Sequence, residues 1–323
     1  MSVLAVRWGR ASWPRVPLTT VPVFTPGPVS STDAVSSPIP VSSLVPVTTT
    51  VAVSTTGADE NHPRAFAPPR PGFGMDRDPA AALDVDVADE DLREHFEGHS
   101  FRGQEYTLLP DARHGLERGT AVFEDAVVRG YPSIPRVLVL DPGVPDFFAS
   151  AEAVVVEEKL NGYNVRVARV GDDRLALTRS GYVCPWTTAL VRERVPAAFF
   201  DDHPRACLCV EVIGDENPYT TFPYPEVDDA AMFVTDIRNR RTGEPTPVEV
   251  RRERCAAYDL PQAPLLGTHD RDDAVEAVRS HVEALDDRGR EGVVLRSPDG
   301  RDPLKYTTSA IHRADLAHAF ALP

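Results

Sequence analysis

The sequence predicts an α+β fold in which antiparallel sheets are flanked by helices. Short apolar runs of strand character follow one another between residues 151 and 310. The turn signals Gly-Asp-Asp (171–173) and Pro-Asp-Gly (298–300) each separate two such runs, as in a β-hairpin. The clearest helical stretch covers 270–289. Many hairpins with few helices between them favour antiparallel sheets over a doubly wound parallel sheet.

Residues 1–74 have the composition of a disordered, low-complexity tail. Pro, Val, Ser and Thr recur there without helix or strand boundaries, and only three acidic residues precede Met75, whereas the rest of the chain is densely acidic. A translation start assigned too early, with Met75 as the natural start, explains the same shift, and we favour it. A mucin-like or surface-anchoring tail is a third interpretation, although Arg7, Arg10 and Pro14 make the N-terminus a poor signal peptide.

Residues 75–150 are expected to form an N-terminal part that packs on a main domain at 151–310. Within that part, the stretch DEDLREHF (89–96) predicts a short helix with acidic residues in its first turn. Residues 311–323 would be a short C-terminal remnant.

Along the main domain, period-two patterns and apolar runs bounded by turn residues predict strands. These strands cover 153–158, 164–170, 174–180, 207–214, 231–237, 292–297 and 303–308. The helix predicted over 270–289 ends at Gly289, a residue common just past helix ends. Its apolar positions share one face, as an amphipathic helix requires; they are Ala274, Val275, Val278, Val282 and Leu285.

Composition indicates a soluble globular protein, with 42% hydrophobic and 26% charged residues. The formal net charge of −15 argues against broad attraction to nucleic acid or anionic membrane, but it allows a local basic site. Acid-rich composition with 32 arginines and two lysines resembles that of haloarchaeal proteins. No apolar run is long enough to span a membrane. The four cysteines form no CxxC pair, which predicts buried, reduced thiols in a cytoplasmic protein.

The two lysines, Lys159 and Lys305, are informative because they are rare. Arginine keeps its proton at neutral pH, whereas a lysine amine can be made neutral by burial or by neighbouring positive charge and can then act as a nucleophile. Lys159 follows an apolar strand and opens KLNGYN, where Gly162 permits close backbone approach or a turn with positive φ. Asn161 and Asn164 add uncharged hydrogen-bond donors. This pattern predicts a reactive amine at a strand end.

The segment EKLNGYN resembles motif I, KxxGxN, of the covalent nucleotidyltransferases, which include ATP-dependent ligases and mRNA capping enzymes. The resemblance implies a ligase-type nucleotidyltransferase domain, unrelated to the ATP-grasp fold, over 151–310. It also implies that the Lys159 amine attacks the α-phosphate of a nucleotide, releasing pyrophosphate and leaving a lysyl-nucleotide intermediate. Glu158, Asn161, Gly162 and Asn164 would contact the nucleotide.

Further stretches resemble the next motifs of the family in the same order. TRSG (178–181) is similar to motif Ia, which implies that Arg179 contacts the nucleotide or the RNA end. CVEVIG (209–214) is similar to motif III, and a carboxylate among apolar residues is costly unless paired, so Glu211 would bind a ribose hydroxyl or a metal. MFVTDIRN (232–239) resembles motif IIIa, in which Phe233 would stack on the purine while Asp236 and Arg238 brace the site. Plain core packing is the other interpretation of Phe233.

The last two motifs contain the remaining acid and the second lysine. EGVVL (291–295) resembles motif IV, which implies that Glu291 holds a divalent cation. PLKY (303–306) resembles motif V, in which Lys305 would stabilise negative charge on the α-phosphate. Motif V often has two lysines, and Pro303 replaces the first one here. Both lysines of the chain thus fall on motifs that need one.

Among these families, the chain is similar to the archaeal ATP-dependent RNA ligases, a homodimeric group that can circularise single-stranded RNA. Asn161 and Asn164 replace the acid and arginine usual in DNA ligases, and RGYPSIPRVLVLDPGVPDFF (129–148) resembles the segment before motif I in that group. The resemblance implies ATP and Mg²⁺ or Mn²⁺ as requirements, and single-stranded RNA with 5′-phosphate and 3′-hydroxyl ends as substrate. Eighteen residues follow Lys305, whereas family members continue with a region that makes the dimer, so dimerisation and full ligation are open.

Three alternatives remain on the sequence alone. The chain could be a DNA ligase or a capping-type guanylyltransferase, which use the same lysyl-nucleotide chemistry. It could be a nucleotide- or RNA-binding module that has lost catalysis. A Schiff-base lysine enzyme is the third alternative, and it would leave Glu211, Glu291 and Lys305 without a role.

Overall fold

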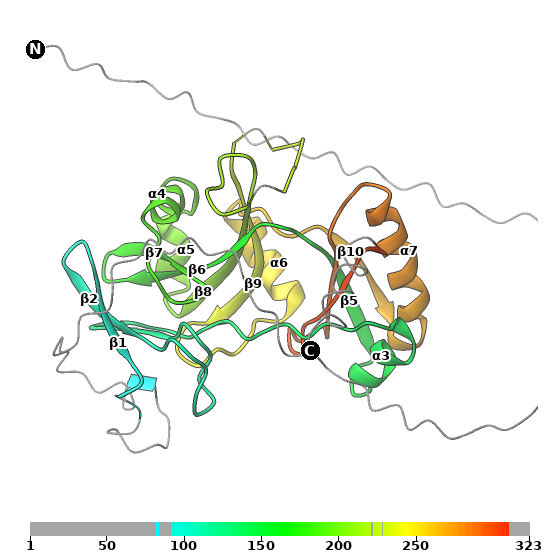
Figure 1. Ribbon diagram of the computed structural model, residues 1–323, viewed down its shortest axis with the longest axis horizontal. Coiled ribbons are helices and arrows are strands. Elements are labelled where there is room, and N and C mark those ends of the chain that lie inside the picture. The colour runs from blue at the N-terminus through cyan, green and yellow to red at the C-terminus, as the bar shows by residue number, and fades with distance from the viewer. Residues whose placement is uncertain (1–81, 84–91, 93, 221, 228, 310–323) are drawn as a thin grey trace, which may run out of the picture. The chain divides into compact units, whose positions relative to one another are not determined.

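Three antiparallel sheets of four strands each organise the structure, a computed structural model that describes residues 82–83, 92, 94–220, 222–227 and 229–309 (Figure 1). The predicted α+β class with antiparallel sheets is confirmed. The described residues belong to one compact unit. None of the helices among them is both long enough and apolar enough to cross a membrane.

The sheet that contains both lysines has the strand order β10-β5-β11-β12. Its strands are β5 (Ala153–Lys159), β10 (Leu265–Asp270), β11 (Gly292–Arg296) and β12 (Leu304–Thr307). Helices α3 (Leu140–Phe147) and α7 (Ala274–Asp286) cover one face, as Figure 1 shows. Val154 and Val156 of β5 pack against these helices. Because side chains alternate along a strand, Val155, Glu157 and Lys159 point to the opposite face.

The central sheet has the order β7-β6-β8-β9. Its strands are β6 (Tyr163–Val170), β7 (Asp173–Thr178), β8 (Ala206–Ile213) and β9 (Ala231–Asn239). Helices α4 (Pro185–Arg194) and α5 (Ala197–Asp202) bury one face through a core that includes Val191, Phe199 and Phe200. The same core contains Cys255 of α6 (Val248–Ala257).

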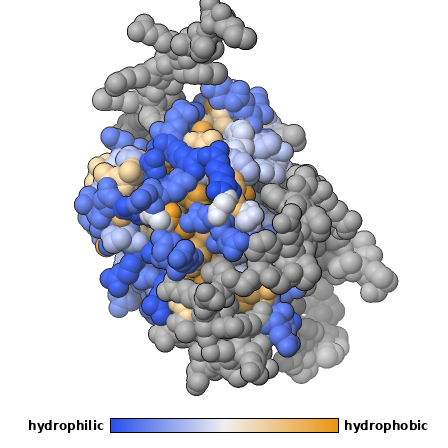
Figure 2. Space-filling model, turned by 90° about the vertical axis from the view of Figure 1, so that its left-hand side faces the viewer, coloured by the Kyte–Doolittle hydropathy of each residue, from blue (hydrophilic) through white to orange (hydrophobic). Residues whose placement is uncertain are grey.

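The other face of the central sheet packs against the third sheet, β1-β2-β3-β4. These strands are β1 (Glu97–Phe101), β2 (Gln104–Leu108), β3 (Ala121–Phe123) and β4 (Val127–Val128). Arg166 of β6 is 1% exposed and donates hydrogen bonds to backbone carbonyls of Gly119, Arg129 and Thr178, so it fastens the N-terminal segment to the central sheet. Figure 2 views the β1, β2 and β7 side, which is mainly hydrophilic with a small hydrophobic area near its centre.

Buried charges join the lysine-bearing sheet to the central sheet. The Glu157 carboxylate of β5 binds Arg251 of α6 and lies 3.4 Å from Nε of Arg296 in β11. Nη1 of Arg296 lies 3.5 Å from Oδ2 of Asp236 in β9, and Arg251 also donates to the Thr235 carbonyl of β9. Each of the four charged side chains is at most 2% exposed. We call Glu157, Asp236, Arg251 and Arg296 the buried ionic network.

Every strand predicted between residues 151 and 310 is present, with ends shifted by one or two residues at most sites. The helix predicted over 270–289 is shorter: a 3₁₀ turn, Arg271–Asp273, precedes α7, and Gly289 follows with a φ of 66°. All four cysteines are buried and unpaired, as predicted. Residues 1–74 and 311–323 lie outside the described residues, as does half of the helix predicted over 89–96. Of its described residues, Leu92 is helical and residues 94–95 form a turn.

Candidate active site

Lys159 is the last residue of β5, and its amine forms an ion pair with Glu291. The distance from Nζ to the Glu291 Oε2 is 2.7 Å. Strand pairing sets this contact, because Lys159 stands opposite Gly292, the first residue of β11. A Cβ at Gly292 would lie 2.2 Å from the carbonyl oxygen of Tyr306, so only glycine allows the β11–β12 hairpin to close here. Glu291 is 9% exposed.

Lys305 lies on the same face of this sheet as Lys159. Lys159, Gly292 and Thr307 occupy one row across β5, β11 and β12, and Lys305 precedes Thr307 by two residues. Burial, followed by the positive charges of Lys159, Arg136 and Arg179, lowers the pKa of Lys305 to about 8, while Glu291 opposes the shift. The two lysines therefore share one electrostatic environment.

Glu211 reaches the same place from the central sheet. In the register of β6, β8 and β9 it stands between Asn164 and Phe233. Its carboxylate accepts hydrogen bonds from the backbone N–H of Gly162, at 3.0 Å, and from Nδ2 of Asn164, at 3.5 Å. Although part of the side-chain surface stays accessible, desolvation of the carboxyl raises its pKa to about 7. The charge of Lys159 opposes this shift and that of Glu291 adds to it.

The turn between β5 and β6 is held tightly against β8. A Cβ at Gly162 would lie 2.1 Å from the carbonyl oxygen of Val212. The sequence suggested either close backbone approach or a turn with positive φ at Gly162. Close backbone approach applies, because the φ of Gly162 is not in the left-handed region. The N–H of Asn161 donates to the Tyr224 hydroxyl at 2.6 Å. Tyr224, Phe233 and Leu160 share an apolar cluster beside this turn.

The remaining sequence-predicted residues have partners of their own. Glu158 lies on the opposite face of β5 from Lys159 and pairs with Arg290 at 3.7 Å; burial raises the pKa of its carboxyl. Arg179, which follows β7, donates to the Ser133 hydroxyl at 2.9 Å. Nη1 of Arg238 lies 3.0 Å from Oδ2 of Asp236, a member of the buried ionic network.

The carboxylates near Lys159 limit how a metal could be bound. Among the described residues, no group of three or more His, Cys, Asp and Glu side chains is arranged to hold a metal ion. Glu211 and Glu291 supply two carboxylates beside the amine. Mg²⁺ typically binds one or two carboxylates and takes its other ligands from water and substrate phosphates, so this donor set fits Mg²⁺ or Mn²⁺ bound together with a nucleotide.

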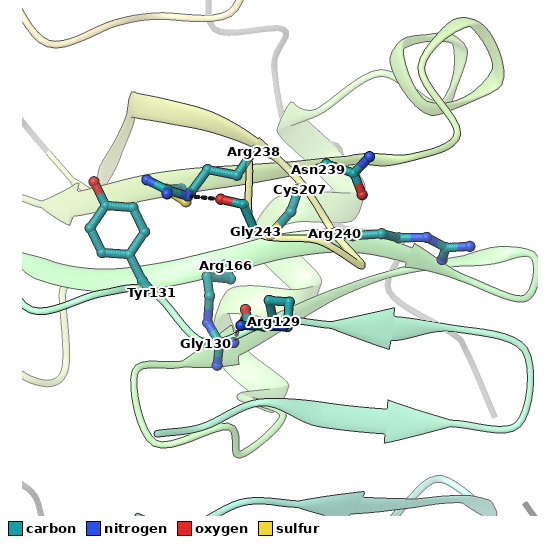
Figure 3. A pocket seen from close by; sticks show the side chains of 10 residues that line it. Arg129, Gly130, Tyr131, Arg166, Cys207, Arg238, Asn239, Arg240 and Gly243 are labelled. Carbon is teal, nitrogen blue, oxygen red and sulfur yellow. Dashed lines mark hydrogen bonds between the residues drawn. The ribbon is translucent and has the colours of Figure 1, made fainter. Parts of the chain in front are cut away.

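A small, partly enclosed void is lined by residues other than the four charged groups described above, Lys159, Glu211, Glu291 and Lys305. Its volume is about 10 Å³, close to the space for one water molecule. Figure 3 shows Arg166, Arg238 and Tyr131 around it, with Arg238 donating to the carbonyl of Gly243 at 2.7 Å. The void is too small for a nucleotide, and it lies between the central sheet and residues 129–131.

Sequence reasoning missed several residues that shape the site. The charged Glu157 and Arg296 inside otherwise apolar strands were a visible signal of buried pairing. Tyr224 and Arg136 had no such signal, because their positions depend on loops that pair with distant strands. The assembled groups comprise an amine, a second cation, two carboxylates and backbone donors. This set suits attack by the amine on a phosphoryl group whose charge is neutralised nearby.

Comparisons with known proteins also point to an enzyme that transfers a phosphoryl group. A family model described as RNA ligase matches residues 152–307. An uncharacterised protein of Methanocaldococcus jannaschii is 39% identical over 249 residues, which cover 73% of this chain and 62% of that protein. Among solved structures, form 1 of an archaeal ATP-dependent RNA ligase matches with a TM-score of 0.69 and 37% identity over 75% of this chain and 66% of the other.

A putative ATP-dependent DNA ligase from Aquifex aeolicus matches with a TM-score of 0.65 and 31% identity, over 72% of this chain and 66% of that one. The chain therefore spans between 62% and 66% of the length of these relatives.

Proposed function

This chain belongs to the RNA ligase family, and from that premise we propose that it is an ATP-dependent RNA ligase. It forms a lysyl-AMP intermediate at Lys159 and joins RNA 5′-phosphate to 3′-hydroxyl ends on one strand or between two. One observation supports this above all others. Lys159, Glu291, Lys305 and Glu211 come from four separate segments and two sheets, yet they interact within one site.

The first step is transfer of AMP to the enzyme. The lone pair on Nζ of Lys159 attacks the α-phosphorus of ATP, a P–N bond forms, and the P–O bond to the β-phosphate breaks. Pyrophosphate leaves with the bonding electrons, and the amine loses its proton. Phosphoryl transfer depends mainly on positioning and charge neutralisation. The register of β5 against β11 fixes the position of the amine.

The neighbouring side chains each have a role in this step. Lys305 neutralises charge on the α-phosphate as it is attacked, and Glu211 and Glu291 would hold Mg²⁺ or Mn²⁺. When bound, the cation supplies further neutralisation of the triphosphate. Phe233 stacks on the adenine from the β9 side of the site, and Asn161, Gly162 and Asn164 line the nucleotide through the β5–β6 turn. Glu158, predicted from the sequence to contact the nucleotide, lies on the opposite face of β5 and pairs with Arg290, so it is not assigned to this lining. Asp236 and Arg238, which pair with each other on β9, support the site without touching the nucleotide.

Two further transfers complete the reaction. An oxygen of the RNA 5′-phosphate attacks the phosphorus of the lysyl-AMP, the P–N bond breaks, and Lys159 regains its proton. A 3′-hydroxyl then attacks the 5′-phosphorus of the activated end, and AMP leaves. Single-stranded RNA is the proposed partner and the cytoplasm is the proposed compartment. The molar mass in solution decides between a monomer and a homodimer.

The experiment is intact-mass analysis after incubation with ATP and Mg²⁺ at high salt. Because the chain has only two lysines, Lys159→Arg and Lys305→Arg identify the modified one directly. The parent should gain one adenylate, and Lys159→Arg, which is still positively charged, should gain none. Equal labelling of the parent and of Lys159→Arg would show that Lys159 is not the residue that takes up the adenylate.

Two comparisons separate the alternatives. GTP in place of ATP tests the capping reaction, and 5′-phosphorylated DNA in place of RNA tests DNA ligation. A parent chain that binds ATP and never gains mass would be a binding module.

A further inference from the structure

Positive charge is concentrated beside Lys305, against the overall charge of the chain. Lys159, Arg136 and Arg179 all act on the Lys305 amine, and Glu291 is the opposing acid. The chain as a whole carries a net charge of −15. A local excess of cations in an acidic protein indicates a site for a polyanion. Lys159 and Lys305 already have roles in AMP transfer, whereas Arg136 has none.

Backbone pairing fixes Arg136 next to Lys305. The N–H of Lys305 donates to the carbonyl of Pro135 at 2.9 Å, and the N–H of Val137 donates to the carbonyl of Lys305 at 3.0 Å. Arg136 and Lys305 thus form a parallel β-bridge, and bridged residues direct their side chains to the same face. Val137 is 7% exposed and packs in the core under α3 and α7, which anchors the segment. Arg136 therefore projects from a rigid support.

The same segment reaches the central sheet three residues earlier. The hydroxyl of Ser133, an exposed residue, accepts a hydrogen bond from Nη2 of Arg179 at 2.9 Å. Residues 133–136 therefore run from Arg179 on one sheet to Lys305 on the other. Both arginine side chains keep part of their surface accessible. Arginine suits such a site because its planar guanidinium can bind two phosphate oxygens at once.

We propose that Arg136, together with Arg179 and the hydroxyl of Ser133, binds the 5′-phosphate of the RNA strand that receives the adenylate. The proposal rests on the ligase function proposed above. The phosphates of ATP share this chemistry, but one observation favours the RNA end. Ser133 is exposed, and a macromolecular end can reach it.

Arg136 would act in the second transfer. There, a phosphate oxygen with negative charge must approach the negatively charged phosphorus centre on Lys159. A guanidinium bound to the other oxygens of that phosphate reduces the repulsion and directs the attacking oxygen. When the P–O bond forms and the P–N bond breaks, the electron pair returns to Nζ of Lys159, which takes up a proton. The first transfer, from ATP, does not need this contact.

Single-turnover kinetics on the full chain test the assignment. The parent, Arg136→Gln, Arg136→Lys and the control Arg279→Gln, an exposed residue of α7 paired with Glu276, are adenylylated with ATP and Mg²⁺, desalted, and mixed with 5′-phosphorylated RNA. We expect Arg136→Gln to keep self-adenylylation within about threefold and to lose transfer to RNA by about 10–100-fold. Arg136→Lys should recover part of the transfer, and Arg279→Gln should match the parent.

Equal loss in both steps would assign Arg136 to the phosphates of ATP, and no loss in either would remove it from phosphate binding; both results overturn the proposal. A binding measurement keeps the test separate from the ligase function. Fluorescence anisotropy with 5′-phosphorylated and 5′-hydroxyl RNA of one sequence should show a preference for the phosphorylated strand that Arg136→Gln abolishes. A parent without self-adenylylation would refute the ligase function, and the absence of this preference would still refute the phosphate site by itself.

Discussion

The amine of Lys159 lies 2.7 Å from a carboxylate oxygen of Glu291. The amine that we propose as the nucleophile is therefore held in an ion pair by the acid that we assign to the metal. The Glu291 carboxylate that would hold a cation is the same one that pairs with the amine. The ion pair fixes the position of the amine, and it has to break before the amine can react.

Glu291→Gln should lower the rate of self-adenylylation by about 10²–10³-fold, because it removes one of two carboxylates available to the cation. The rate of adenylate gain measured by mass at several Mg²⁺ concentrations checks this. Part of the loss should be recovered at high Mg²⁺. Glu276→Gln, on the exposed side of α7, is the matched control. A Glu291→Gln rate within threefold of the parent at all Mg²⁺ concentrations would contradict the metal role.

Lys305 should confer a measurable pH dependence. Its pKa of about 8 means that the amine carries its charge at pH 7 and largely loses it by pH 9. Lys305→Arg stays charged over this range, so the ratio of its second-order rate constant for ATP to that of the parent should rise between pH 7 and pH 9. Rates at ATP concentrations far below saturation measure this, since they report the free enzyme. A ratio independent of pH would show that Lys305 charge does not matter for the first step.

Glu211 should make metal-free protein less stable as pH rises. Its pKa is about 7 when folded against a usual value of 4.5, so the folded state holds the proton more tightly. The corresponding contribution to stability is complete below about pH 4.5 and is lost as pH rises through 7. Glu211→Gln should therefore gain stability relative to the parent from pH 5 to 8. Denaturant unfolding in EDTA measures the difference, and a constant difference across this range would contradict the shifted pKa.

Gly162→Ala should damage both stability and activity. The added Cβ would meet the Val212 carbonyl at 2.1 Å, and relief of such overpacking typically costs about 1–3 kcal/mol. The displaced turn would also move Lys159, so adenylylation should fall more than the folded fraction does. Gly289→Ala is a useful comparison, because nothing lies within 4 Å of its Cβ position and only its φ of 66° is unfavourable. It should lose stability and keep its adenylylation rate.

Strands, turns and candidate site residues could be predicted from the sequence where the pattern that marks them is local. Strands at 153–158 and 292–297 and the hairpin turns were visible as alternation and turn residues, and the scarcity of lysine directed attention to Lys159 and Lys305. The structure brings these lysines together through the pairing of β5 with β11 and of β11 with β12. That pairing joins residues more than a hundred positions apart, and nothing in the sequence alone specifies its register.

Three features that the sequence reasoning missed lack a recognisable local pattern. The β1–β4 sheet has short strands, two of which have two or three residues, and these are too brief for a period to be recognised. Helix α6 buries Val248, Arg251 and Cys255, and the middle one of these is a charged residue that pairs with Glu157. Such a helix has no apolar stripe to detect. Arg136 depends on an isolated bridge to Lys305 that only the folded chain creates.

The buried ionic network has a consequence for ionic strength. Exposed pairs such as Arg301 with Glu244, whose side chains are 61% and 63% exposed, lose most of their attraction in concentrated electrolyte, where the Debye length falls to about 3 Å at 1 M. Glu157 and Arg251 are each 1% exposed, so mobile ions cannot enter between them. Dissolved salt should thus change how fast an anionic strand arrives, while the spacing between the two sheets stays the same in dilute buffer and in brine.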